Sequence, residues 1–322
     1  MAFRFKLDEP IAQNFHRIGL EQIQRARKQL DANVAPETEI HEARKSIKRI
    51  RALLRLAREG LGDRVFRAEN ARFRTIAARL APARDDHVIL QTILLLEAHA
   101  DGEARAALTR LRTAVIAHGN GSLQERGQGI AEANTALERA ARRFRRLAIE
   151  PDDFATLAKG LTRSYRRGLK WFAQAYAENN DEAFHEWRKC VQAHWRHMSL
   201  LSKVWPAVFE ARVEAARDLS QILGEDHDLA ILKARLPMLP AGTLSDEEAR
   251  VIEQMVLVRQ HALRRAAAPR GQLLYAEKAK AHGRWILALW EAATALRRGD
   301  TEPESEQTSP RLENGFPPTA RA

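Results

Sequence analysis

The chain carries the same short motif twice, as "IHEARKSIKRIR" at residues 40–51 and "FHEWRKCVQAHW" at residues 184–195. Two further matches occur in the same order at almost the same spacing. They pair "FHRIGLE" (15–21) with "SYRRGLK" (164–170), and "LAPARDDHVIL" (80–90) with "LGEDHDLAIL" (223–232). We therefore interpret the chain as two homologous helical bundles related by a pseudo-two-fold axis. A period this long is not that of a solenoid.

The boundary between the two predicted repeats falls at "IEPDDF" (149–154), where a proline and an aspartate cap interrupt the helical pattern. The sequence predicts one domain over residues 1–298, with repeat one at about 1–148 and repeat two at about 152–298. The last segment, 299–322, is polar and rich in proline, and we expect it to be disordered.

The residue composition favours an all-α fold. Ala, Leu, Arg and Glu fill the helix-length segments, and no stretch alternates in the manner of a strand. In the second half we expect helices at about 153–178 and 181–204, one from Pro206 to Gly224, a short one before 237–242, and two long ones at about 245–267 and 271–298.

Several classes of protein are disfavoured by simple counts. The single cysteine, Cys190, excludes a disulfide framework within the chain and a cysteine zinc cluster. The first ten residues carry charges where a signal peptide needs its apolar stretch, and no run approaches the roughly 20 apolar residues of a membrane span. We therefore expect a cytoplasmic protein with no membrane partner. Its net charge of +11 predicts a polyanionic partner.

The first motif places its cations on one face of a helix. At about 100° per residue, Ile40, Ala43, Ile47, Ile50, Leu54 and Ala57 form a core face. The opposite face carries His41, Arg44, Lys45, Lys48, Arg51 and Arg55. Like charges at i,i+4 repel one another, so the stripe destabilises the helix unless an anion approaches it. We interpret it as an anion track, although a single helix of this kind is equally compatible with a solvated basic face.

The second motif repeats this arrangement in a weaker form. Its core face is formed by Phe184, Trp187, Val191, Met198 and Leu201. Its outer face carries His185, Arg188, Lys189 and Arg196, with Gln192 and Trp195 where the first copy has Lys48 and Arg51. If the two bundles face each other, the two stripes line one shared groove or pore.

Other basic residues extend the predicted site. The turn at Arg84 aligns with the turn at His227, each followed by an aspartate that we expect to orient a helix end or a partner arginine. Arg166, Arg167 and Lys170 precede the His185 helix closely enough to reach the same groove, and Lys278 adds a further cation. The arginines of "RRFRR" (142–146) spread around their helix, which is more typical of a solvated surface.

Alternative chemistries find little support in the motifs. Each motif histidine has Arg and Lys at i+3 and i+4, which repel a divalent metal. Nucleophilic catalysis lacks a partner, because Cys190 is replaced by Ser46 in the first copy. No phosphate-binding glycine loop or dinucleotide fingerprint is present. A histidine-based metal-binding or phospho-acceptor module remains an alternative hypothesis without a partner motif.

Taken together, these residues resemble the CHAD family, the conserved-histidine α-helical domains. The resemblance rests on both His-x-x-Arg-Lys helices, the Arg84-Asp85 and His227-Asp228 turns, and Tyr165-x-x-Gly168, and it covers about residues 1–298. It implies two four-helix bundles around a central basic pore that binds inorganic polyphosphate without catalysis. It also implies an association with polyphosphate-handling enzymes or polyphosphate granules. We accordingly expect no enzymatic activity and no cofactor.

The physical chemistry agrees with polyphosphate, a thin and densely charged chain without bases. Lys, Arg and protonated His supply the point charges and forks that such a chain needs. RNA or single-stranded DNA would also require aromatic platforms for its bases. Most aromatic residues that can be placed lie on core faces. Trp195 is the exception, and it keeps nucleic-acid binding as the alternative function.

Overall fold

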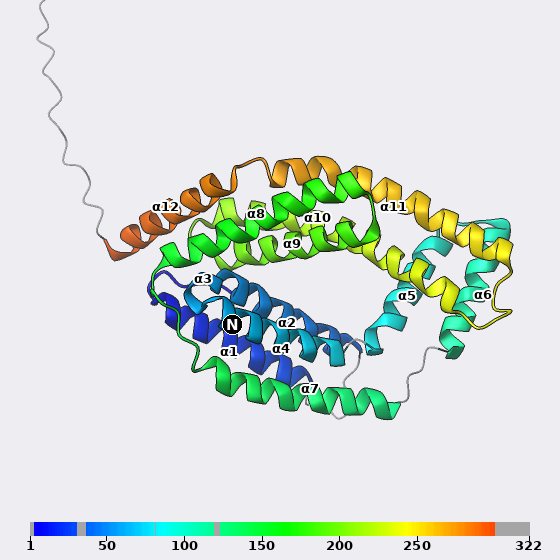
Figure 1. Cartoon of the computed structure of the whole chain (residues 1–322), viewed down its shortest axis with the longest axis horizontal. Helices are drawn as coiled ribbons and strands as arrows, with labels where there is room; N and C mark the ends of the chain where they lie inside the picture. The colour runs from blue at the N-terminus through cyan, green and yellow to red at the C-terminus, as the bar shows by residue number, and fades with distance from the viewer. Residues whose placement is uncertain (1–2, 31–36, 81, 119–122, 300–322) are drawn as a thin grey trace, which may run out of the picture.

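The computed structural model describes residues 3–30, 37–80, 82–118 and 123–299, and no strand occurs among them. The helices in chain order are α1 (Ile11–Leu30), α2 (Glu37–Leu56), α3 (Arg58–Leu61), α4 (Asp63–Arg79), α5 (Pro82–Glu97), α6 (Gly102–His118), α7 (Leu123–Phe144), α8 (Phe154–Glu178), α9 (Asp181–Leu200), α10 (Pro206–Arg235), α11 (Asp246–Leu274) and α12 (Ala279–Arg298), with a 3₁₀ turn at Leu236–Met238 (Figure 1). The predicted all-α class is confirmed. The predicted tail lies almost entirely outside the described residues.

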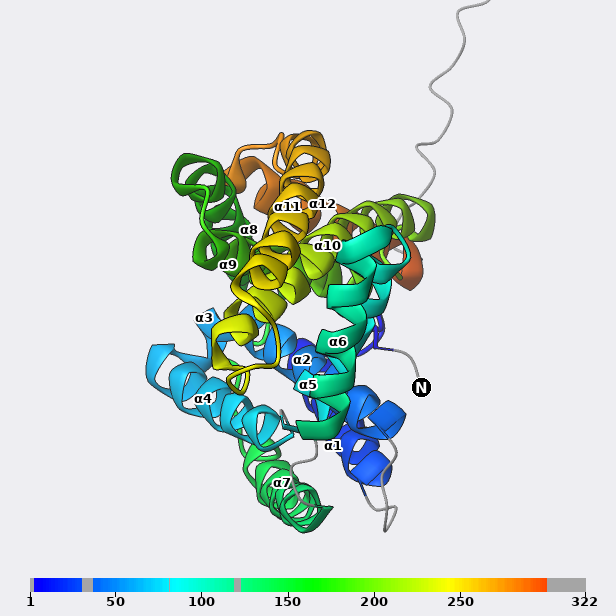
Figure 2. The same cartoon turned by 90° about the vertical axis from the view of Figure 1, so that its right-hand side faces the viewer.

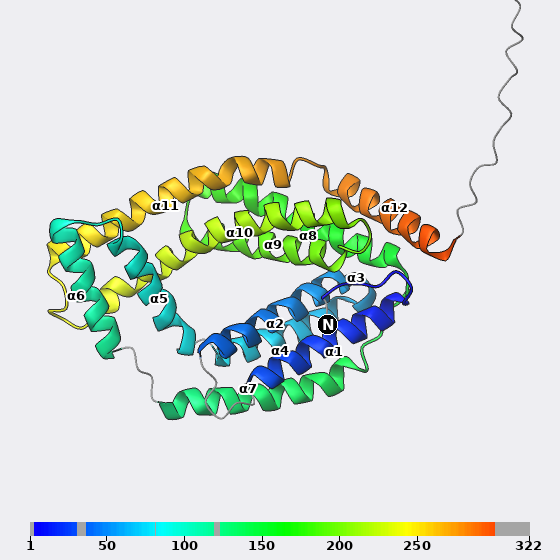
Figure 3. The ribbon, with the colours of Figure 1, turned by 180° about the vertical axis from the view of Figure 1, so that it is seen from behind.

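The helices pack in three groups. In the first half of the chain, α1 packs on α2 and α7, and α4 packs on α2 and α7. In the second half, α9 lies between α8 and α10, while α12 packs on α8 (Figure 3). The hairpin of α5 and α6 extends beyond the other helices of the first half (Figure 1), keeps contact with α2 through α5, and packs on α10 and α11 (Figure 2). The pseudo-two-fold axis, the pore and the division into two repeats stay predictions.

The helix α2 carries its predicted core face into the interior. Ile40, Ala43, Ile47, Ile50, Leu54 and Ala57 are all buried. The predicted core face of α9 is buried as well, at Phe184, Trp187, Val191, Met198 and Leu201. The faces that carry the two motifs are thereby turned toward each other, since α2 contacts both α8 and α9.

Three predicted helix ends are wrong. The helix α10 runs through Gly224 to Arg235, because a buried stripe that includes Leu219, Leu223 and Leu229 continues across the glycine. The packing of these side chains outweighs the roughly 1 kcal/mol that a helical glycine costs. Likewise, α11 continues through Pro269 to Leu274, and α12 begins only at Ala279 rather than near residue 271.

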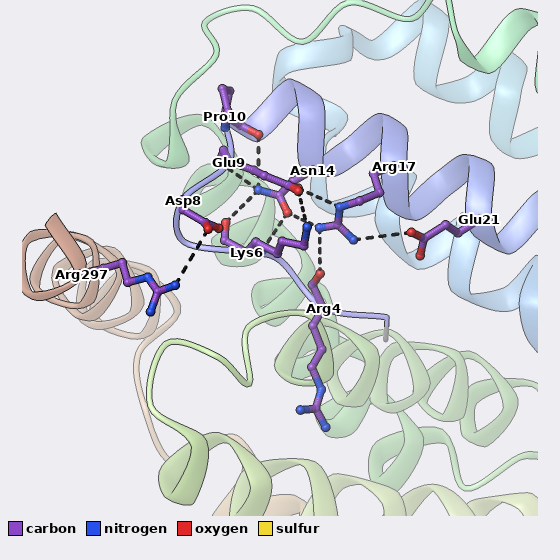
Figure 4. A network of polar contacts seen from close by, with 9 residues as sticks. All are labelled: Arg4, Lys6, Asp8, Glu9, Pro10, Asn14, Arg17, Glu21 and Arg297. Carbon is purple, nitrogen blue, oxygen red and sulfur yellow. Dashed lines mark hydrogen bonds and ion pairs between the residues drawn. The ribbon is translucent and has the colours of Figure 1, made fainter. Parts of the chain in front are cut away.

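The segment before α1 is tied to the body of the protein. The Asn14 side chain accepts from the backbone N–H of Lys6 at 2.8 Å and donates to its carbonyl at 2.9 Å, while Glu9 pairs with Arg17 at 2.7 Å (Figure 4). The backbone N–H of Phe5 donates to the carbonyl of Leu200 on α9 at 2.8 Å. These bonds fix the segment against both halves of the chain.

None of the described helices combines the length and the apolar character needed to cross a membrane.

Candidate functional site: a cationic cavity between two helices

The two basic stripes meet at one cavity of about 240 Å³, which we call the cationic cavity. Its charged lining comes from α2, α9 and α10 and consists of Arg44, Lys48, Arg51, Arg55, His185, Arg188, Lys189, Arg196 and His227. Ala52, Gln192 and Ala193 complete it, so the lining contains no carboxylate. Nine of the sixteen predicted site residues are therefore brought to one place, with those of α2 at least 130 residues before those of α9 and α10.

The α2 side chains are positioned by contacts with α4. Arg44 donates to the carbonyl of Ala77 at 2.8 Å, and Arg51 donates through Nε to Asn70 at 3.1 Å. Burial, followed by the charge of Arg74, lowers the pKa of Arg51. These bonds hold the two guanidinium groups in place beside the cavity.

Two arginines of the cavity lining, Arg55 and Arg196, lose much of their hydration through burial. Arg196 is only 7% exposed, and it donates to the carbonyl of Gln192 at 2.6 Å. Burial, then the charges of Arg49 and Arg55, lowers its pKa to about 9. Burial, then the charge of Arg51, lowers the pKa of Arg55 to about 10. Neither Arg55 nor Arg196 makes an ion pair with a carboxylate in the described part of the chain.

The sequence predicted Arg196 on the outer face of the second motif, facing a shared groove, and Arg196 lies in the lining of the cationic cavity. The outer faces of α2 and α9 are turned inward, toward each other, so Arg196 is enclosed by the contact between the two helices. A buried guanidinium without a carboxylate carries a desolvation penalty of several kcal/mol. An anion that entered the cavity would therefore offset part of this desolvation penalty.

Two histidines form a pair on the cavity wall. The Nδ1 atoms of His185 and His227 lie 3.1 Å apart. Their rings stack with centroids 4.2 Å apart at an interplanar angle of 29°. Burial, followed by the charges of Lys189 and Arg188, lowers the pKa of His185. The α9 turn before the motif is fixed by its cap, because Asn180 accepts from the N–H of Ala183 at 2.8 Å.

Acids lie near the cavity but outside its lining. Glu186 pairs with Lys189 and, at 2.9 Å, with Arg167 of α8. Glu42 pairs with Lys45 at 2.5 Å and with Arg25 at 3.7 Å. The basic stripes are thus partly neutralised, and in the second stripe this includes Lys189 of the cavity lining.

The remaining predicted residues do not line the cavity. His41, Lys45, Arg166, Lys170 and Lys278 are exposed, and Arg167 is committed to Glu186. The side chain of Arg84 lies outside the described residues. Arg167 still raises the positive potential at the cavity, because its charge contributes to the lowered pKa of Arg55.

A second cavity, of about 560 Å³, contains basic residues that the sequence did not single out. We call it the arginine–tryptophan cavity, and its basic and aromatic lining consists of Phe3, Arg4, Arg25, Arg49, Trp195, Arg196 and Arg217. Glu210 and Glu214 also line it. Arg196 belongs to both cavities. The guanidinium carbons of Arg196 and Arg217 lie 4.3 Å and 5.6 Å from the Trp195 ring.

The described side chains show no arrangement typical of a metal site. Within the described residues, no group of three or more His, Cys, Asp or Glu side chains is arranged to hold a metal ion. Cys190 is buried, and burial raises the pKa of its thiol to about 11.

The fold and the cavity together define the class of protein: it is all-helical in its described part, and the two copies of its basic motif, on α2 and α9, line one cationic cavity. The chain belongs to the CHAD domain family, because the family model of that name matches residues 17–237. Among solved structures, the chain is similar to "PptA from Streptomyces chartreusis", with a TM-score of 0.58 and 14% sequence identity. That similarity covers 84% of this chain and 100% of the other, and it shows the fold. A comparison with curated proteins finds no match.

Proposed function

We propose that this protein binds inorganic polyphosphate in the cationic cavity without chemically changing it. The observation that carries the proposal is a lining of seven Arg or Lys side chains and two histidines with no carboxylate among them. Such a lining suits a ligand whose negative charges are dense and whose own surface offers no bases to recognise. Membership of the CHAD family supports the same substrate class.

The two cavities support the predicted central pore. Arg196 lines both of them, so a flexible anionic chain lying in one would pass its guanidinium on the way into the other. We propose that the helices α1, α2, α4 and α7 and the helices α8, α9, α10 and α12 correspond to the two predicted bundles. The pore would then open where α2 meets α9. Association with polyphosphate-handling enzymes and with granules in the cytoplasm is part of the same proposal.

Nucleic acid is the weaker candidate. The aromatic residue that could stack a base, Trp195, already lies under the guanidinium of Arg196 at 4.3 Å, with that of Arg217 at 5.6 Å. A base would have to displace one of these cation–π contacts, each of which is worth about 0.5–2 kcal/mol.

The proposal is tested by direct binding of a long-chain polyphosphate to paired charge variants. Lys48→Gln with Arg51→Gln removes two cations from the cavity lining. Arg145→Gln with Arg146→Gln removes two exposed cations elsewhere and serves as the charge-matched control. We expect the cavity variant to lose at least tenfold in affinity and the control to lose less than threefold, a difference of about 0.7 kcal/mol or more in binding free energy.

The same samples test the absence of catalysis. Incubation with polyphosphate, ATP and a divalent metal should release no phosphate and extend no chain. Equal loss of affinity in both charge variants would show that the ligand senses only net charge and would contradict the cavity. Steady phosphate release proportional to protein would contradict the binding-only function.

A further inference from the structure

The histidine pair has a property that single histidines in a basic site lack. A hydrogen bond between two Nδ1 atoms requires one of them to donate and the other to accept. At 3.1 Å, two protonated Nδ1 atoms would direct their hydrogens at each other. While His185 and His227 keep this contact, the pair therefore holds one Nδ1 proton rather than two.

The cations that face the His185–His227 pair oppose the binding of a further proton to either ring. From α9 and α2 the cavity adds Arg44, Lys48, Arg188 and Lys189. The carboxylates of Glu182 and Glu186 on α9 act in the opposite direction on His185, but burial and the two cations of its own helix outweigh them. Glu186 is in turn paired with Lys189 and Arg167, which reduces its influence.

Two arginines of α11 and the one titratable group among the described side chains of α5 are already paired with opposite charges. From α11, Arg259 pairs with Glu225 at 2.5 Å and Arg264 pairs with Asp226 at 2.8 Å. Asp228 follows on α10, half-buried. The described side chains of α5, from residue 88 on, include one titratable group, Glu97, which pairs with Arg112 at 3.3 Å.

We infer that the His185–His227 pair takes up a proton when a polyphosphate chain enters the cationic cavity, so that affinity rises as the pH falls. The inference rests on the proposed function and adds proton coupling to it. Negative charge in the cavity stabilises the imidazolium form of either ring, because opposite charge at close range favours the charged state. The added proton lets the pair offer more N–H donors to phosphate oxygens.

The size of the effect follows from linkage. Uptake of one proton on binding makes the affinity change by up to about tenfold per pH unit, in the direction of tighter binding at lower pH. Partial uptake gives a proportionally smaller slope. Between pH 8 and pH 6 we expect the affinity for long-chain polyphosphate to rise by about ten- to a hundredfold beyond any change in a variant without the pair.

The experiment is calorimetric titration of the full chain with long-chain polyphosphate in buffers of different ionisation enthalpy. The dependence of the observed heat on that enthalpy gives the number of protons taken up. A long chain is chosen because only its terminal phosphates titrate near neutral pH, which keeps proton exchange by the ligand small. The wild-type measurement needs no variant and therefore does not depend on a variant folding.

Two variants assign the proton. His185→Gln with His227→Gln removes the pair, and we expect proton uptake to disappear and the affinity to become nearly independent of pH. His261→Gln removes an exposed histidine of α11, outside both cavities, and should leave proton uptake unchanged.

The outcomes separate this inference from the function on which it rests. Tight binding of polyphosphate with no proton uptake, or uptake unchanged in the double variant, would overturn the coupling and leave the proposed function standing. No binding at either pH would overturn both. Uptake of about one proton in the wild type, lost in the double variant and kept in His261→Gln, is the result that we expect.

Discussion

Replacing Arg196 with methionine should stabilise the ligand-free protein and weaken polyphosphate binding. The guanidinium is 7% exposed, and burial lowers its pKa to about 9, well below its usual value. At about 1.36 kcal/mol per pKa unit, that shift corresponds to a penalty of about 5 kcal/mol on the charged form. Removing the charge relieves this penalty, while the methionine keeps much of the apolar stem.

Two lost contacts reduce the gain. The bond from Arg196 to the carbonyl of Gln192 is worth about 1–1.5 kcal/mol net. The contact with the Trp195 ring is worth about 1 kcal/mol. We therefore expect the free energy of unfolding of Arg196→Met to rise by about 2.5–3 kcal/mol, which lies within the range found when buried charges are replaced by apolar side chains.

Urea unfolding and polyphosphate affinity, measured on the same samples, test this expectation. Arg217→Met is the control for stability, because it approaches the same ring from an exposed position and should change stability by less than about 0.5 kcal/mol. Arg196→Met should lose at least about tenfold in affinity, or 1.4 kcal/mol. A variant that is destabilised yet binds polyphosphate with full affinity would refute the reasoning, since Arg196 would then be a structural residue.

Three further predictions follow from the packing and the charges. Burial lowers the pKa of His194 and His282, and that of His197 to about 4. In the unfolded chain these histidines have a pKa of about 6.5, so below that pH the unfolded state binds more protons than the folded state. Thermal melts should therefore show stability falling from pH 7 to pH 4. Gly160→Ala should cost about 1–3 kcal/mol, because its Cβ would meet the carbonyl of Leu56, whereas Gly127→Ala, in open space, should be neutral or stabilising in the same urea series. If about six phosphates are neutralised, the plot of log affinity against log salt should have a slope of about −4, and a slope near zero would contradict an electrostatic site.

Most residues of the cationic cavity could be predicted from the sequence, because apolar and basic residues alternate with the period of a helix. The 3.6-residue period of α2 and α9 separated buried Ile47 and Val191 from the cations on the other side of each helix. The internal repeat then suggested that the two basic faces belong together. What periodicity could not supply is how deeply Arg196 is buried in the contact between the two helices.

The parts that the sequence missed depend on distant segments. Arg4, Arg25 and Arg217 reach the arginine–tryptophan cavity from three elements, and none of them belongs to a motif. The pairing of His185 with His227 depends on how α9 packs on α10, which no local pattern encodes. The broken helix expected at Gly224 was wrong for a similar reason, because tertiary packing overrides local propensity.

The measurement that tests the central claim most directly is a competition between long-chain polyphosphate and single-stranded RNA of matched charge. Labelled polyphosphate is bound to the full chain at a fixed, near-physiological salt concentration, and each unlabelled competitor is then titrated. The lining of the cationic cavity contains no Trp, Tyr or Phe, and Trp195 of the neighbouring cavity is covered by guanidinium groups. We therefore predict that polyphosphate competes at least about tenfold better than RNA. If RNA displaces the polyphosphate more effectively, the protein is a nucleic-acid-binding protein and the account given for the cationic cavity is wrong.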